Sequence, residues 1–66
     1  MVFNQVLKDL RNEKGLFQSQ LAKFLNVSNN TVSSWERGNS EPDIAQLIAL
    51  ADFFDVSVDY LLGREV

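Results

Sequence analysis

Residues 18–38, QSQLAKFLNVSNNTVSSWERG, decide how the rest of the chain folds. They predict a helix over residues 18–25, a short turn over residues 26–28 and a second helix that ends at Gly38. Ser28 is a favoured N-cap because its hydroxyl can accept a hydrogen bond from a free backbone N–H. Gly38 is a good helix end because positive φ costs glycine little.

The second helix of this stretch has two unlike sides. A rotation of about 100° per residue places Val32, Trp35 and the aliphatic stem of Glu36 together on one side. The opposite side carries only amides, hydroxyls and a guanidinium. A helix of this kind is suited to lie against a polar partner. The residues of the polar side are Asn29, Asn30, Ser33, Ser34 and Arg37.

Length and composition bound the remaining possibilities. The 66 residues allow one small domain over residues 1–66, which buries about 60% of its unfolded surface. The absence of Cys and His excludes disulfides, Cys/His zinc sites and His-based catalysis. No apolar run approaches the roughly 20 residues that span a bilayer, and no secretory signal is evident. The sequence therefore predicts a cytoplasmic protein without a cofactor.

No constellation in the sequence suggests an enzyme or a metal site. No serine has a neighbouring base to activate it, and no Gly-rich loop is present. Three acidic residues gather near the end of the fourth predicted helix, but caps and a solvated face explain them better than metal ligation, which needs convergent ligands. They are Asp52, Asp55 and Asp59.

The charge of the chain is unevenly distributed. The net charge is −3 and the isoelectric point is near 4.6, which opposes a nucleic-acid partner, because affinity for DNA rests largely on phosphate neutralisation. However, residues 1–40 carry a balance of +2 and residues 41–66 a balance of −5. Because screening acts over about 8 Å at physiological salt, distant acids matter little to a docked face. We expect weak non-specific binding and a need for dimerisation.

Three more helices are predicted around the central pair. The first spans residues 3–14, the fourth spans residues 44–54, and the fifth runs from a cap at Ser57 to Gly63. Asp43 and Gln46 form a capping-box-like pair at the start of the fourth helix. Apolar spacing places Ile44, Leu47, Ile48, Ala51 and Phe54 of that helix toward the core.

The motifs together resemble a known family. LxxLRxxKGLxQxxLAxxLxVSxxTVSxWERG, followed by EPD, LxxLADFF, VS and DYLLG, is similar to the helix-turn-helix domain of Cro/cI-type repressors, the XRE family. The resemblance runs from about Leu7 to Gly63. It implies an all-α, five-helix, lambda-repressor-like domain whose second and third helices form the helix-turn-helix.

The resemblance implies that the third helix enters the major groove of double-stranded DNA. Asn29 and Asn30 suit adenine, whose N6 donor and N7 acceptor match a carboxamide, and the short Ser33 and Ser34 can contact several bases. Glu41 would repel phosphate unless it points away. By resemblance, Arg11 pairs with Glu36, and the expected phosphate contacts are Gln18, Arg37, Asn39, Ser40 and Arg11.

The family also suggests how such a protein acts. We expect a transcriptional regulator, a repressor in particular, that binds a near-palindromic operator as a homodimer with half-sites roughly 34 Å apart. The chain is either a complete small repressor or the N-terminal domain of a longer one. The dimer contact is expected around the fifth helix, at Val56, Val58, Tyr60 and Leu61.

Two aromatic residues depart from the family pattern. Phe17 stands at a position that usually holds a capping Ser, Thr or Asn, and Phe24 stands where charged or small residues are commoner. They either cover the edge of the core or form a patch for a protein partner. With the acidic balance and Glu41, the second interpretation favours another function: a protein-interaction module of antitoxin- or antirepressor-binding type with little DNA affinity.

Overall fold

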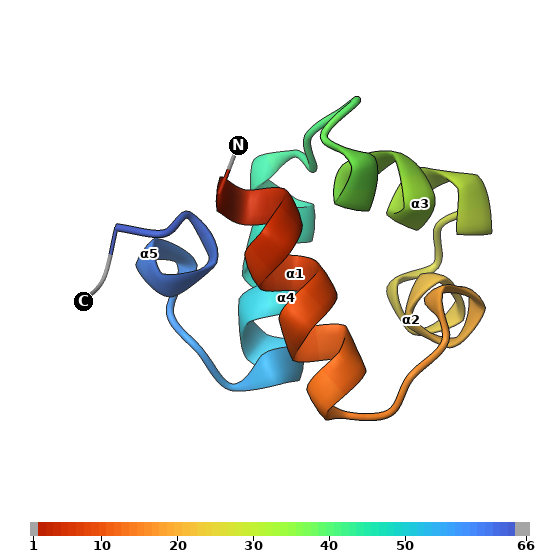
Figure 1. Ribbon diagram of the computed structural model, residues 1–66, viewed down its shortest axis with the longest axis horizontal. Helices are drawn as coiled ribbons and strands as arrows, with labels where there is room; N and C mark the ends of the chain where they lie inside the picture. The colour runs from red at the N-terminus through yellow and green to blue at the C-terminus, as the bar shows by residue number, and fades with distance from the viewer. Residues whose placement is uncertain (1, 65–66) are drawn as a thin grey trace.

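The computed structural model describes residues 2–64, which form five α-helices (Figure 1). The predicted all-α fold is confirmed. The predicted first helix was one residue late at each end, and the predicted domain of residues 1–66 extends beyond the described residues at both termini. No helix in the described range is long and apolar enough to cross a membrane. The helices are α1 (Val2–Glu13), α2 (Gln18–Leu25), α3 (Asn29–Arg37), α4 (Ile44–Phe54) and α5 (Val58–Leu61).

The helices begin and end where local chemistry predicts. The Ser28 hydroxyl accepts a hydrogen bond from the Thr31 N–H at 3.1 Å, which caps α3. The turn before it passes through Asn26, whose φ of 60° is the left-handed conformation that asparagine tolerates. At the other end of α3, Gly38 takes a φ of 77°. The helix-turn-helix therefore follows from signals only a few residues apart.

The start of α4 carries the predicted capping box. The Gln46 N–H donates to the Asp43 carboxylate at 2.8 Å, and the Asp43 N–H donates to the Gln46 side-chain oxygen at 2.8 Å. The Ser57 hydroxyl accepts from the Tyr60 N–H at 2.9 Å and caps α5. Asp55 ends α4 with a φ of 56°.

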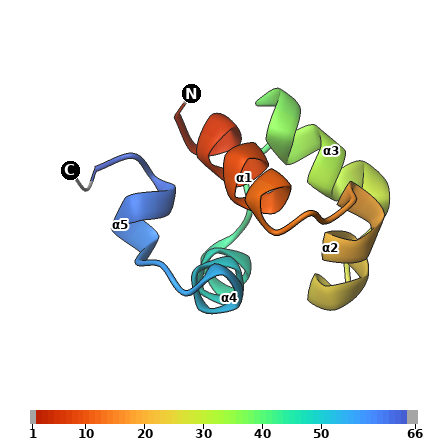
Figure 2. The same ribbon diagram turned by 60° about the horizontal axis from the view of Figure 1, so that its bottom comes forward.

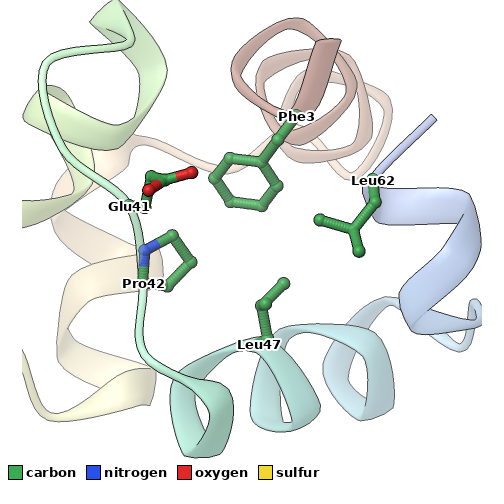
Figure 3. Close-up of a pocket in the computed structure, with 5 residues that line it drawn as sticks. All are labelled: Phe3, Glu41, Pro42, Leu47 and Leu62. Carbon is green, nitrogen blue, oxygen red and sulfur yellow. The ribbon is translucent and has the colours of Figure 1, made fainter. Parts of the chain in front are cut away.

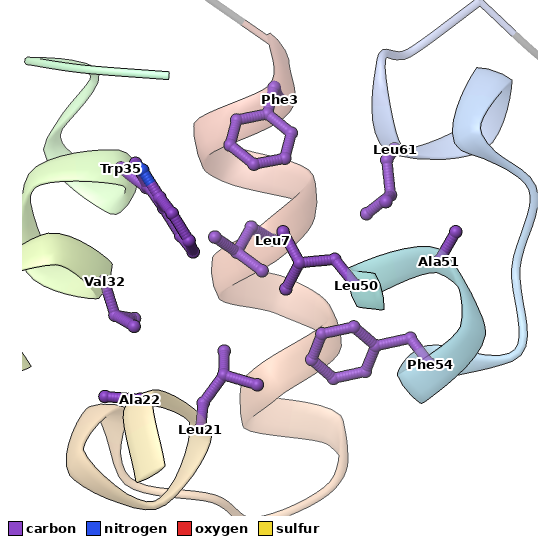
Figure 4. Close-up of a cluster of buried hydrophobic side chains, with 10 residues drawn as sticks. All are labelled: Phe3, Leu7, Leu21, Ala22, Val32, Trp35, Leu50, Ala51, Phe54 and Leu61. Carbon is purple, nitrogen blue, oxygen red and sulfur yellow. The ribbon is translucent and has the colours of Figure 1, made fainter. Parts of the chain in front are cut away.

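All five helices contribute to one hydrophobic core (Figure 4). Leu7 of α1, Leu21 of α2, Val32 of α3, Leu50 of α4 and Leu61 of α5 are completely buried. Burying such a side chain contributes about 1.5–3 kcal/mol to stability. The inner sides of α2 and α3 are thereby fixed to the body of the protein.

The side of α4 that faces the core agrees only in part with the predicted one. Ile44 and Ile48 were expected inside, but their side chains are 77% and 50% exposed. The buried positions are Leu50, Ala51 and Phe54, with Leu47 packed against them. The prediction was right at Leu47, Ala51 and Phe54 and wrong at Ile44 and Ile48, because nearly every position of this helix is apolar and spacing permits more than one inner face. Packing against the neighbouring helices decides between those faces.

α1 divides the molecule into two sides. In both views α2 and α3 lie on one side of α1 and α5 lies on the other (Figures 1 and 2). α3 packs against α1 and α2 through its apolar side. The polar side of α3 consequently faces outward at one end of the molecule.

Candidate nucleic-acid interface

The polar side of α3 is open to solvent. Asn29, Asn30 and Arg37 are exposed, and Ser33 and Ser34 are half-buried, whereas Val32 and Trp35 on the opposite side are buried. In the described part of the chain, neither Asn30 nor Arg37 uses its side chain in an internal hydrogen bond. These side chains keep their full hydrogen-bonding capacity for a partner.

The loop after α3 folds back onto the same surface. The Asn39 N–H donates to the Ser34 carbonyl at 3.0 Å, and the hydroxyl oxygens of Ser34 and Ser40 lie 2.8 Å apart. Asn39 and Ser40 are both exposed. The two loop residues expected at phosphates are therefore joined to one of the residues expected at a base.

A buried ion pair holds α3 against α1. The Arg11 Nε donates to Glu36 Oε2 at 2.6 Å and Nη2 donates to Oε1 at 3.0 Å, while Nη1 donates to the Leu16 carbonyl at 2.6 Å. The Gln18 amide of α2 donates to Glu36 Oε1 at 3.0 Å. The hydrogen bond with Glu36 raises the pKa of Arg11 above its ordinary value, against the opposing effect of burial. One carboxylate thus joins α1, α2 and α3.

The burial of Arg11 changes its expected role. Arg11 and Glu36 are both buried, and the Arg11 nitrogens donate inward to Glu36 and Leu16. A phosphate contact requires donors that face outward. We therefore assign Arg11 first to positioning α3, and its two remaining N–H hydrogens leave the phosphate contact as a prediction. Gln18 donates only one amide hydrogen to Glu36, so it remains among the predicted phosphate contacts.

Two residues near α3 were not singled out from the sequence. Thr31 is half-buried beside the polar side of α3, and its hydroxyl lies 2.8 Å from the Ser28 hydroxyl. Asn4 of α1 donates from Nδ2 to the Glu36 carbonyl at 3.3 Å. Helical rotation could have flagged Thr31, but Asn4 is 32 residues from its partner, and no local signal connects them.

Glu41 lies in the wall of a small pocket of about 130 Å³. Its side chain points toward Phe3 of α1, and the other lining residues are Pro42, Leu47 and Leu62 (Figure 3). Glu41 is nevertheless exposed, so its carboxylate stays at the rim of this pocket in contact with solvent. Within residues 2–64, acidic side chains form no group of three or more that could hold a metal ion.

The expected dimer residues divide into two groups. Leu61 is completely buried in the core of its own chain, so its assignment to an interface was wrong. Val56 and Val58 are half-buried, and Tyr60 is 44% exposed. The neighbouring Leu62 is 40% exposed. A one-residue step along a short helix rotates a side chain by about 100°, enough to exchange an inward for an outward position.

Phe17, the N-cap residue of α2, and Phe24, inside α2, are 72% and 69% exposed. The Phe24 ring lies 4.3 Å from the Phe53 ring, centroid to centroid, and the Lys14 ammonium lies 5.6 Å from the Phe53 centroid. Phe24 covers the edge of the core only in part. Phe24 and Phe53 are in ring contact, and together with the separate exposed ring of Phe17 they are named the aromatic patch below.

The comparisons with known proteins decide the family. A family model described as helix-turn-helix matches residues 7–61 of the chain. The chain belongs to the helix-turn-helix family. This helix-turn-helix chain is 43% identical to the transcriptional activator BcrR of Enterococcus faecalis over 65 residues, which are 98% of the chain and 32% of BcrR. It is 38% identical to the transcriptional regulator ImmR of Bacillus subtilis over 65 residues, which are 98% of the chain and 51% of ImmR.

A solved structure matches the helix-turn-helix chain over nearly its whole length. The crystal structure of the P22 c2 repressor in complex with a synthetic operator aligns with a TM-score of 0.90 and 32% identity, covering 98% of each chain. The fold is therefore that of a lambda-repressor-like domain, and the relatives are transcriptional regulators, not enzymes. The chain spans about a third to a half of the two curated relatives.

Proposed function

We propose that this protein binds double-stranded DNA sequence-specifically and regulates transcription as a repressor. The observation that supports the proposal is the polar side of α3, which is exposed and carries side chains free to bond a partner, while the buried Arg11–Glu36 pair holds the helix in place. An α-helix fits the major groove, and its N-terminal residues contact base edges. The P22 c2 repressor, solved with an operator, gives the same arrangement of helices.

Base contacts are assigned to the outward residues of α3. Asn29 and Asn30 lie in its first turn and are exposed, and each can form a bidentate pair with adenine. Ser33 and Ser34 are short enough to let the helix approach the bases closely. The proposed operator is therefore rich in adenine at the positions nearest the N-terminus of α3.

Phosphate contacts surround this helix. Arg37 is exposed at its C-terminal end, Asn39 and Ser40 follow in the loop, and the amide of Gln18 is oriented by Glu36 at the start of α2. Glu41 is exposed at the rim of the pocket, so its carboxylate remains a source of local repulsion that these contacts must outweigh. These groups fix the register of the helix on the duplex and carry no sequence information.

We place the dimer contact on α5 and the residues beside it, at Val56, Val58 and Tyr60. α3 and α5 lie at opposite ends of a molecule 29 Å long (Figure 1). Two copies joined through α5 carry their α3 helices at the outer ends of the dimer, and the angle between the copies has to bring these helices to one DNA turn, roughly 34 Å, apart. We place the protein in the cytoplasm of a bacterium, with the chromosome or a phage genome as its partner.

The test is selection of binding sites from random duplex DNA, followed by gel shifts at two salt concentrations. The expected result is an enriched near-palindrome whose binding weakens steeply with salt, because each neutralised phosphate contributes a slope of about −0.9 in log K against log salt. Failure to enrich any duplex, or binding that does not respond to salt, would contradict the proposal.

A second candidate function rests on the aromatic patch, whose exposed Phe17 and Phe24 favour a contact with a protein partner. In the alternative, an antitoxin- or antirepressor-binding module, the patch is the principal site and DNA affinity is minor. The double variant Phe17→Ser/Phe24→Ser separates the two functions. Under the main proposal it keeps operator binding. Two results together would support the alternative. The wild type would bind no operator, and the double variant would lose binding to the protein partner.

A further inference from the structure

Ser34 is tied to the loop after α3 by both its main chain and its side chain. Its carbonyl accepts from the Asn39 N–H at 3.0 Å, and its hydroxyl oxygen lies 2.8 Å from that of Ser40. The left-handed conformation of Gly38, with a φ of 77°, turns the chain back to make both contacts. The Ser40 hydroxyl thus sits beside the outward side of α3, where base contacts are proposed.

The direction of the bond between the two hydroxyls is open in the free protein, since either atom can be the donor. A serine hydroxyl has one proton to donate and two lone pairs that accept. Whichever serine donates to the other has no proton left for a third group. What the Ser34 hydroxyl can offer to a base therefore depends on what Ser40 does with its own proton.

A DNA phosphate determines that direction, because its oxygens carry no proton and can only accept. When Ser40 donates to a phosphate, as the proposed function has it, Ser40 can only accept from Ser34. The proton of Ser34 is then used, and its free lone pairs can only accept from a base. In the major groove the amino groups of adenine and cytosine donate, whereas guanine and the thymine carbonyl present acceptors.

We propose that Ser40 is a positioning residue that makes Ser34 selective for adenine or cytosine over guanine and thymine. This inference rests on the proposed function, since it needs a duplex whose phosphate reaches Ser40. Without the Ser40 hydroxyl, Ser34 regains a free proton and can pair with donors and acceptors alike. Ser40 then affects base choice without touching a base.

The experiment repeats the random-duplex selection with wild type and four variants. Ser34→Ala identifies the base position that Ser34 contacts, and Ser33→Ala is the matched control on the neighbouring serine. Wild type is expected to prefer adenine or cytosine at that position by about threefold to tenfold, the worth of a single hydrogen bond. Ser40→Ala should abolish this preference there and nowhere else. Ser40→Thr, which keeps the hydroxyl, should retain it.

A purely structural or phosphate-binding role for Ser40 gives a different pattern. In that case Ser40→Ala lowers the affinity for every sequence alike and leaves the base profile unchanged, which would overturn the inference alone. A wild-type preference for guanine or thymine at the Ser34 position would also overturn it. If the wild type enriches no duplex, the proposed function is wrong, and this inference, which rests on it, is wrong as well.

Discussion

At the scale of single residues, the distance between partners along the chain decided what could be predicted. The caps at Ser28, Asp43 and Ser57 bond groups three residues away, so each was evident from local sequence. The Arg11–Glu36 pair joins residues 25 apart and was expected only from the family resemblance. The bond between Ser34 and Ser40 depends on the path of a loop, which neither spacing nor composition reveals.

The effects of replacing Arg11 and Glu36 on the free energy of unfolding should not be additive. Arg11→Met leaves a buried carboxylate without its cation and should cost about 3–5 kcal/mol of unfolding free energy. The double variant Arg11→Met/Glu36→Met should recover most of that loss, because no uncompensated charge remains. Urea unfolding measures both, with Arg37→Met as the exposed control, expected within about 0.5 kcal/mol of wild type. Additive losses in the double variant would contradict this account.

Asn30 should carry a large share of base recognition. Removing one bidentate contact costs about 1–3 kcal/mol, so Asn30→Ala should weaken binding to the selected operator about tenfold or more. Asn12→Ala, which truncates an exposed asparagine on α1, is the matched control and should leave affinity unchanged. Titration of labelled duplex measures the two dissociation constants. Equal affinity for wild type and Asn30→Ala would remove Asn30 from the contacts.

At the scale of helices, capping signals predicted the helix ends well. Apolar spacing predicted the buried faces of some helices but not of others. The bounds of α2 and α4 agree with the prediction, and the polar and apolar sides of α3 are where rotation placed them. On α4 the inner face was misjudged at Ile44 and Ile48, and on α5 the buried Leu61 was wrongly included in the dimer contact. A helix that is apolar all round contains little information about its orientation, which only its neighbours determine.

The start of α2 should be open to stabilisation. Phe17 has φ −77° and ψ 156°, nearly the same as Ser28 at the start of α3, yet it offers no acceptor for an N–H. Gln20 already accepts from the Phe17 N–H at 2.7 Å, so Phe17→Ser would complete a capping box. The expected gain is about 1 kcal/mol in the free energy of unfolding.

Phe24→Ser is the matched control for this gain. Phe24 is as exposed as Phe17 but lies inside α2, and its ring contacts Phe53. Its replacement should give no gain and a small loss. Thermal unfolding of both variants measures the difference. If Phe17→Ser is no more stable than wild type, the backbone of Phe17 does not act as a cap site.

At the scale of the whole molecule, the acidic net charge is the main obstacle to DNA binding, and the arrangement of helices reduces it. Residues 1–40, which include α3, carry a balance of +2, whereas the excess acids belong to residues 41–66. Exposed charges farther apart than about 8 Å are largely screened at physiological salt. Composition revealed this division, but the position of the exposed Glu41 at the rim of the pocket beside Phe3 required the structure.

Dimer formation on DNA should depend on Tyr60. Tyr60→Glu places a charge on a half-exposed aromatic position next to α5 residues that remain packed, so the fold should persist while the proposed contact is lost. Binding to an operator with half-sites roughly 34 Å apart should then fall to the affinity for a single half-site. Tyr60→Phe is the control. Sedimentation of protein–duplex complexes gives the stoichiometry, and two copies of Tyr60→Glu bound as tightly as wild type would contradict the assignment.

The central claim is that the polar side of α3 meets DNA bases, and proton–nitrogen correlation NMR tests it most directly. The protein is titrated with the selected duplex. We predict that the amide signals of residues 29–34 and 37–40 shift, and that those of Phe24 on α2 and Phe53 on α4 do not. Signals of residues 29–34 that stay unmoved at saturation, or shifts confined to the aromatic patch, would contradict it.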